Sequence, residues 1–98
     1  MVRAGLYPKR LGFCILLMPT VLRFDGLRVV IYPNDHQPAH VHVIGDGLEA
    51  IFSLASDDGR PELIENFGFR TRDVARISAS LAEAREHLAA EWRRIHGG

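Results

Sequence analysis

Two Asp-Gly dipeptides, Asp25-Gly26 and Asp46-Gly47, constrain the fold of this 98-residue chain more than any other feature. Each dipeptide lies between two runs in which apolar and polar residues alternate. Asp-Gly favours a two-residue type I′ turn, because both central residues of that turn need a positive φ. The sequence therefore predicts two successive β-hairpins.

The first hairpin joins a strand over residues 21–24 to a strand over residues 27–32. A two-residue turn fixes the register of the two strands. The expected cross-strand pairs are Phe24–Leu27, Leu22–Val29 and Thr20–Ile31. One side of this hairpin is apolar and is expected to be buried, with Leu22, Phe24, Leu27, Val29 and Ile31. The opposite side carries Val21, Arg23, Arg28, Val30 and Tyr32.

On that opposite side, Arg23 lies directly across from Arg28 in the expected register. Like charges in such a pair are unfavourable unless an anion or a carboxylate lies between them. Two interpretations of this pair stay open. Either the two arginines bind an anion, or a nearby glutamate or solvent satisfies the two guanidinium groups. Arg23 and Arg28 are therefore candidate anion-binding residues.

The second hairpin joins residues 39–44 to residues 48–54. With Asp46-Gly47 as its turn, the expected pairs are Val43–Ala50 and Val41–Phe52. Its apolar side carries Val41, Val43, Leu48, Ala50, Phe52 and Leu54. His40 and His42 then point to the opposite side. Residues 62–69 are a candidate fifth strand at the edge of the sheet, although their patterning is irregular.

From Thr71 onward, apolar residues recur every three or four positions, which is typical of an α-helix. Thr71 is a candidate N-cap, and the capping-box spacing of Ser80 and Glu83 allows a break into two helices near residues 78–80. The helical stripe must cover the apolar side of the sheet. The sequence thus predicts an α+β fold, with an antiparallel sheet of two hairpins and a candidate fifth strand packed against a C-terminal helix. The expected core is Val29, Ile31, Val41, Val43, Phe52, Leu81, Leu88 and Trp92.

Composition fits a single domain, and its charge balance favours no class of partner. Lys plus Arg number 12, and Asp plus Glu number 12, so the net charge favours neither nucleic acid nor a membrane. The lone Cys14 cannot form an internal disulfide, so we expect a cytoplasmic protein.

Residues 1–17 are expected to be an extension of a domain at residues 18–98, with Met18 as an alternative start. A secretory signal, or a strand over residues 13–17, is the alternative for this extension.

Three of the five histidines, His36, His40 and His42, lie within seven residues. His40 and His42 are two positions apart on a strand, so their imidazoles share a face. With His36 from the preceding loop they can bind one transition metal, zinc first, and leave a coordination position open. Asp35 is a further ligand, or the acceptor that orients an imidazole. The same histidines suit metal-free acid–base catalysis or a purely structural role, and these alternatives stay open.

The sequence resembles a small bacterial family, domain of unknown function 4160, from residue 18 to about residue 95. The resemblance lies in residues 18–24 (Met-Pro-Thr-Val-Leu-Arg-Phe), in residues 34–42 (Asn-Asp-His-Gln-Pro-Ala-His-Val-His), and in Glu-His-Leu at residues 86–88 followed by Trp92. The chain departs from the family pattern at Ala39, where the family has proline, and at Val41, where it has an aromatic residue. The resemblance implies a gene beside that of another small domain, in a pairing of the toxin–antitoxin kind.

Two classes of function follow from these observations. The small size, the candidate edge strand and the resemblance favour a domain that works in a complex with a protein partner from a neighbouring gene. The three histidines, with Arg23 and Arg28 on the same polar face, favour a hydrolase or ribonuclease with or without a metal, and RNA as its substrate. The sequence contains neither a Gly-rich phosphate loop nor an H-E-x-x-H motif. Nothing in it favours a membrane partner.

Overall fold

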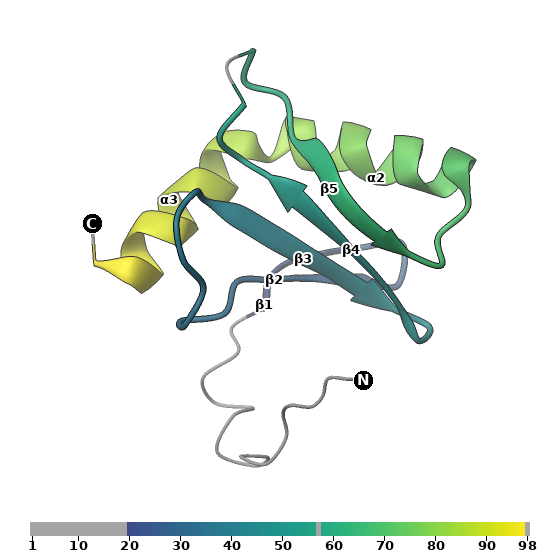
Figure 1. The fold of residues 1–98 in the computed structure, drawn as a ribbon, viewed down its shortest axis with the longest axis horizontal. Coiled ribbons are helices and arrows are strands. Elements are labelled where there is room, and N and C mark those ends of the chain that lie inside the picture. The colour runs from purple at the N-terminus through teal and green to yellow at the C-terminus, as the bar shows by residue number, and fades with distance from the viewer. Residues whose placement is uncertain (1–19, 57, 98) are drawn as a thin grey trace.

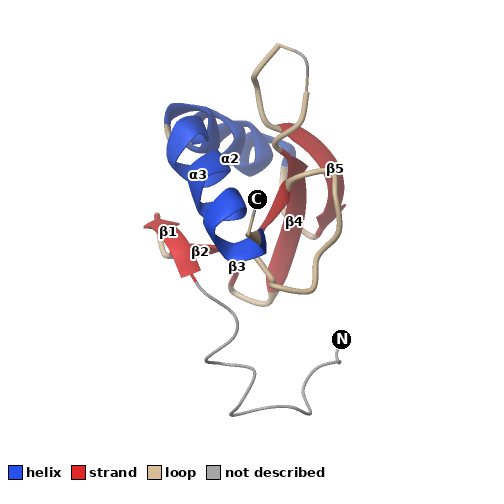
Figure 2. Ribbon diagram, turned by 90° about the vertical axis from the view of Figure 1, so that its left-hand side faces the viewer, coloured by secondary structure: helices blue, strands red, loops and turns tan. Residues whose placement is uncertain are grey.

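The computed structural model describes residues 20–56 and 58–97, which form an antiparallel sheet with two helices on one of its faces (Figures 1 and 2). The sheet has five strands in the order β1-β2-β3-β4-β5. The strands are β1 (Thr20–Phe24), β2 (Leu27–Val30), β3 (His40–Gly45), β4 (Leu48–Ser53) and β5 (Glu62–Phe67), and the helices are α2 (Thr71–Glu83) and α3 (Arg85–His96). The predicted α+β class is confirmed. Residues 1–17, the strand expected over residues 13–17 and the start at Met18 lie outside the described residues.

Both hairpin turns have the backbone geometry that the Asp-Gly dipeptides predict. In the first turn φ is 51° at Asp25 and 77° at Gly26, and in the second it is 53° at Asp46 and 76° at Gly47. Positive φ at both central residues is the signature of a type I′ turn, whose twist matches that of the flanking strands. The observed pairs include Arg23–Arg28, Leu22–Val29, Val43–Ala50 and Val41–Phe52, as expected.

Three details of the first hairpin differ from the prediction. Thr20 lies opposite Val30 instead of Ile31, because the ladder shifts register between Thr20 and Leu22. Strand β2 ends at Val30, although Ile31 just beyond it is fully buried in the core. Val30 faces away from the core and was expected on a polar surface, yet it is also fully buried. The surface that carries Arg28 and His42 is therefore not uniformly polar.

The fifth strand exists, and its irregular pattern has a structural cause. β5 pairs with β4, and the register of this ladder shifts between Ile51 and Phe52. Such an irregularity interrupts the alternation of side chains between the two faces of a strand. Apolar and polar residues therefore do not alternate regularly along residues 62–69, even though the strand is formed.

The C-terminal region is two helices, but the break lies later than the capping-box spacing suggested. α2 runs through residues 78–80, and the break falls at Ala84, whose φ is −102° and ψ is 14°. Leu81 and Leu88, on either side of it, are both fully buried, and this packing outweighs a local capping preference. Thr71 is not the N-cap, because the helix begins at Thr71 and Arg70 holds the cap position. Neither helix in the described part of the chain is long and apolar enough to cross a membrane.

The core fills the space between the sheet and the helices. Every residue that the sequence predicted for it belongs to the observed cluster, which consists of Val29, Ile31, Val41, Val43, Ala50, Phe52, Phe69, Ile77, Leu81, Leu88 and Trp92. Leu22, Phe24 and Leu27 are partly buried against this cluster. One apolar layer thus joins the two hairpins to both helices.

We expect Phe52→Ala and Leu88→Ala each to lower the free energy of unfolding by about 2–5 kcal/mol, because each leaves a cavity in the core. Leu63→Ala, which alters a side chain that is 40% exposed on β5, is the control and should change it by less than about 0.5 kcal/mol. Urea denaturation followed by circular dichroism measures the differences. Equal, small effects at all three positions would show that the register is wrong.

Candidate metal centre

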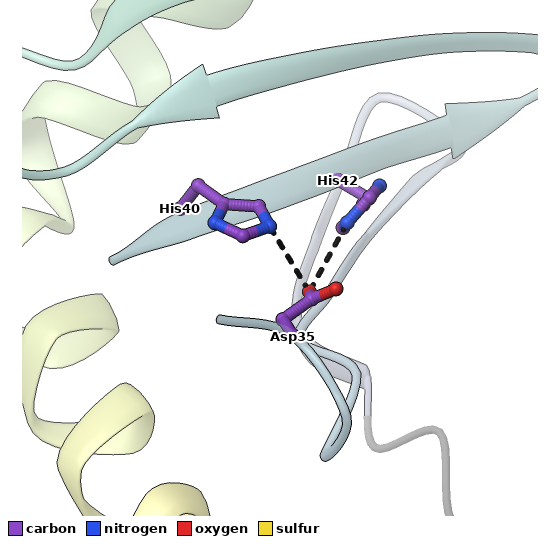
Figure 3. Close-up of side chains that lie close together, drawn as sticks. All are labelled: Asp35, His40 and His42. Carbon is purple, nitrogen blue, oxygen red and sulfur yellow. Dashed lines mark hydrogen bonds and ion pairs between the residues drawn. The ribbon is translucent and has the colours of Figure 1, made fainter. Parts of the chain in front are cut away.

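Asp35, His40 and His42 come together beside the first residues of β3 (Figure 3). His40 and His42 alternate with the buried Val41, so both imidazoles lie on the face of the sheet opposite the core. Asp35 belongs to the connection between β2 and β3. Its N–H donates to the carbonyl of Tyr32 at 3.0 Å, and the N–H of Tyr32 donates to Asp35 Oδ2 at 3.4 Å. This turn presents the Asp35 carboxylate to the two rings.

The three side chains converge on one point. Asp35 Oδ2 lies 3.2 Å from His40 Nε2 and 3.2 Å from His42 Nε2, so both dashed lines in Figure 3 meet at one oxygen. All three ligand atoms lie within 4.8 Å of one another. Zinc bonds of about 2.0–2.1 Å in a tetrahedron put neighbouring ligand atoms roughly 3.3 Å apart. The carboxylate-to-imidazole distances therefore match two edges of a tetrahedral zinc site.

The other ring nitrogen of each histidine contacts an acceptor. His42 Nδ1 lies 2.9 Å from Glu49 Oε2, and His40 Nδ1 lies 2.9 Å from the carbonyl oxygen of Pro38. A carbonyl and an ionised carboxylate only accept, so each Nδ1–H is the donor. In a neutral imidazole the lone pair is then on Nε2, which faces Asp35. Histidines that bind metals are oriented in the same way by their outer contacts.

The charges at this point favour a proton or another cation. Burial alone would lower the pKa of His42, but the hydrogen bonds and charges of Asp35 and Glu49 raise it to about 9. Burial alone would raise the pKa of Asp35, but the hydrogen bond and charge of His42, with the charge of His40, hold it below its usual value. Without a metal, a proton on His42 holds the two carboxylates together. A divalent metal bound to the Nε2 atoms would replace that proton.

Aromatic rings enclose part of the centre and connect it to the helical layer. The rings of Tyr32 and His42 have centroids 4.6 Å apart, and those of His40 and His42 are 5.3 Å apart. Trp92 of α3 brings its ring centroid to 5.3 Å from that of His40. The His40, His42 and Asp35 side chains remain 18%, 12% and 19% exposed. The centre is therefore sheltered but not fully enclosed.

The structure separates His36 from the two other histidines that the sequence grouped with it. His36 is exposed and lies outside the Asp35–His40–His42 cluster. Arg23 and Arg28 face each other across the β1–β2 ladder, and neither has a carboxylate partner among residues 20–56 and 58–97. Whether these arginines bind an anion stays a prediction.

Sequence reasoning missed Glu49, the residue that orients His42. A signal for it was present in the register of the second hairpin, where Glu49 lies opposite Ile44. That position makes Glu49 the diagonal neighbour of His42 on the same face of the sheet. A carboxylate at the diagonal position from a strand histidine is therefore a sequence signal for a residue that orients the imidazole.

We expect the metal-free protein to lose stability between about pH 6.5 and 9, the range between the unfolded and folded pKa values of His42. Because the folded pKa is raised, the stabilisation is complete below the unfolded value and is lost as His42 deprotonates. The loss should be on the order of 2–3 kcal/mol. Urea denaturation in the presence of a chelator measures it. His42→Gln should abolish the slope and His36→Gln should keep it, whereas a flat wild-type profile would contradict the prediction.

Comparison with known proteins gives a family but no activity. Neither the curated proteins nor the solved structures include a match to this chain. The family described as Domain of unknown function (DUF4160) matches residues 26–93, which is more than half of the chain. The matched segment contains Asp35, His40, His42 and Glu49. The chain therefore belongs to this family.

Proposed function

We propose that the protein binds a divalent transition metal, zinc first, through Asp35, His40 and His42, and that it is a metal-dependent hydrolase. One observation carries the proposal. Both histidines have Nδ1 engaged with an acceptor, while both Nε2 atoms lie 3.2 Å from the same carboxylate oxygen. Three protein ligands and one open position are the arrangement of catalytic zinc sites.

Each residue of the centre has a distinct role in this proposal. Asp35 supplies the negative ligand, which offsets part of the charge of the metal. Glu49 makes His42 a stronger base by accepting its Nδ1–H, and the Pro38 carbonyl fixes the tautomer of His40. When bound, the metal supplies a water of lowered pKa as the nucleophile. His36, exposed in the same connection, is a candidate acid–base residue.

The substrate class in this proposal is anionic, with an RNA phosphodiester as the first candidate. Arg23 and Arg28 support it, because they lie on the same face of the sheet as His42. Val30 pairs with His42, and Arg28 is two positions from Val30 on β2, which makes Arg28 a diagonal neighbour of His42. The single cysteine suits a reducing compartment, so we place this activity in the cytoplasm.

A complex with a protein partner, in a module of the toxin–antitoxin kind, is the second candidate function. The exposed strand β5 supports it, since its residues are all exposed at an edge of the sheet. The two functions use different parts of the molecule. An enzyme that is held by a partner is compatible with both.

Metal binding can be followed through Trp92, the only tryptophan of the chain, because its ring lies 5.3 Å from that of His40. We expect copper(II), which can compete for a zinc site, to quench the fluorescence at one equivalent, and a chelator to restore it. His40→Gln and His42→Gln should each weaken binding by at least about 100-fold, and Glu49→Gln by about 10–100-fold. Zinc should also raise the melting temperature, and a chelator should reverse the rise.

The matched control for this experiment is His87→Gln, which changes a histidine on α3 that contacts the carbonyl of Val21 instead of the cluster. It should leave the metal affinity unchanged. Quenching that survives His42→Gln would rule out the centre. Hydrolysis is then measured with bis(p-nitrophenyl) phosphate and with single-stranded RNA. If zinc binds but no hydrolysis that depends on the metal is found, the proposal is reduced to a structural metal site.

A further inference from the structure

Strand β5 is an open edge of the sheet. It pairs with β4 and with no other strand in residues 20–56 and 58–97, so the backbone groups along its outer side have no partner strand there. All six of its residues are exposed. The other edge, β1, has partly buried residues except for Arg23, and α3 contacts it (Figure 2). The two edges are thus not equivalent.

The apolar side chains that the described chain exposes are concentrated on β5. Leu63, Ile64 and Phe67 are 40%, 53% and 53% exposed, and they are the large hydrophobic residues exposed in the described part. Leu63 lies opposite the core residue Phe52, and Phe67 lies opposite Glu49 on the other face of the sheet. Both faces of this edge therefore present apolar surface. A strand added alongside β5 would cover side chains on both faces.

The charges of β5 select the kind of strand that fits. Exposed edges are commonly protected by lysine or proline, and β5 has neither. Its charged residues are Glu62 and Glu65, and neither forms an ion pair with another described residue. Pairing β5 with β5 of a second copy would place four carboxylates along one seam, which like-charge repulsion disfavours. A strand with basic residues removes that repulsion.

We infer that β5 is the docking edge for a strand from another protein, in which lysine or arginine alternates with apolar residues. The added strand becomes the sixth strand of the sheet, and its backbone pairs with the outer side of β5, as in β-augmentation. Its basic side chains lie beside Glu62 and Glu65, on the face that also carries Phe67, and its apolar side chains cover Leu63 on the opposite face. This docking edge does not depend on the metal centre.

The test uses a capped six-residue peptide of alternating lysine and valine as the probe, with a glutamate–valine peptide as its charge-reversed counterpart. Both are titrated into the ¹⁵N-labelled full chain. We expect the lysine peptide to shift the amide signals of residues 62–67 and to bind at least tenfold more tightly than the glutamate peptide. The double variant Glu62→Lys with Glu65→Lys should reverse this preference. The control variant, Glu83→Lys with Glu86→Lys, makes the same charge change at exposed helix positions and should keep it.

Three results would overturn the inference. Shifts that lie outside β5, or equal binding of the two peptides, would show that no basic strand docks on this edge. If the full chain sediments as a dimer and Ile64→Pro returns it to a monomer, the occupant of this edge is a second copy of the chain. Circular dichroism of each variant establishes that it is folded. Because the metal affinity through Trp92 is measured separately, failure here leaves the metal proposal standing.

Discussion

The register of the two hairpins is the constraint on which the rest of this structure depends. Asp25-Gly26 and Asp46-Gly47 form turns with positive φ at both central positions, and such turns permit one pairing of the flanking strands. A slip by one residue would exchange the faces of β3. Val41 would then leave the core, and His40 and His42 would enter it. Core and candidate site are therefore two consequences of the same turn chemistry.

The candidate metal centre combines local and distant contributions. Alternation on β3 places two imidazoles together, but Asp35 arrives from a loop, and Glu49 arrives from β4. Two carboxylates around His42 raise its pKa to about 9, which stabilises a proton where a metal would bind. A metal would therefore compete with the proton for the same nitrogen. The contacts that make His42 a strong base would also make it a strong ligand.

The second surface, β5, has a different origin. The sheet is a simple meander, so its first and last strands are necessarily its edges. α3 contacts the first edge, while the last keeps exposed apolar and acidic side chains. Natural proteins commonly protect such an edge, and exposed apolar surface of this kind marks interaction sites. The proposed metal centre and the proposed docking edge thus use separate parts of the molecule.

Sequence alone determined what depends on neighbouring residues: the turns, the alternation of β3 and β4, the helical stripe, and hence the α+β fold and its core. These follow from backbone preferences and from one apolar face per element. The tertiary structure decided what depends on distant residues: the shift at Thr20, the break at Ala84, the burial of Val30, the exclusion of His36, and the contact of Glu49 with His42. Packing and charge act through space, so they become defined only when the sheet and helices have come together.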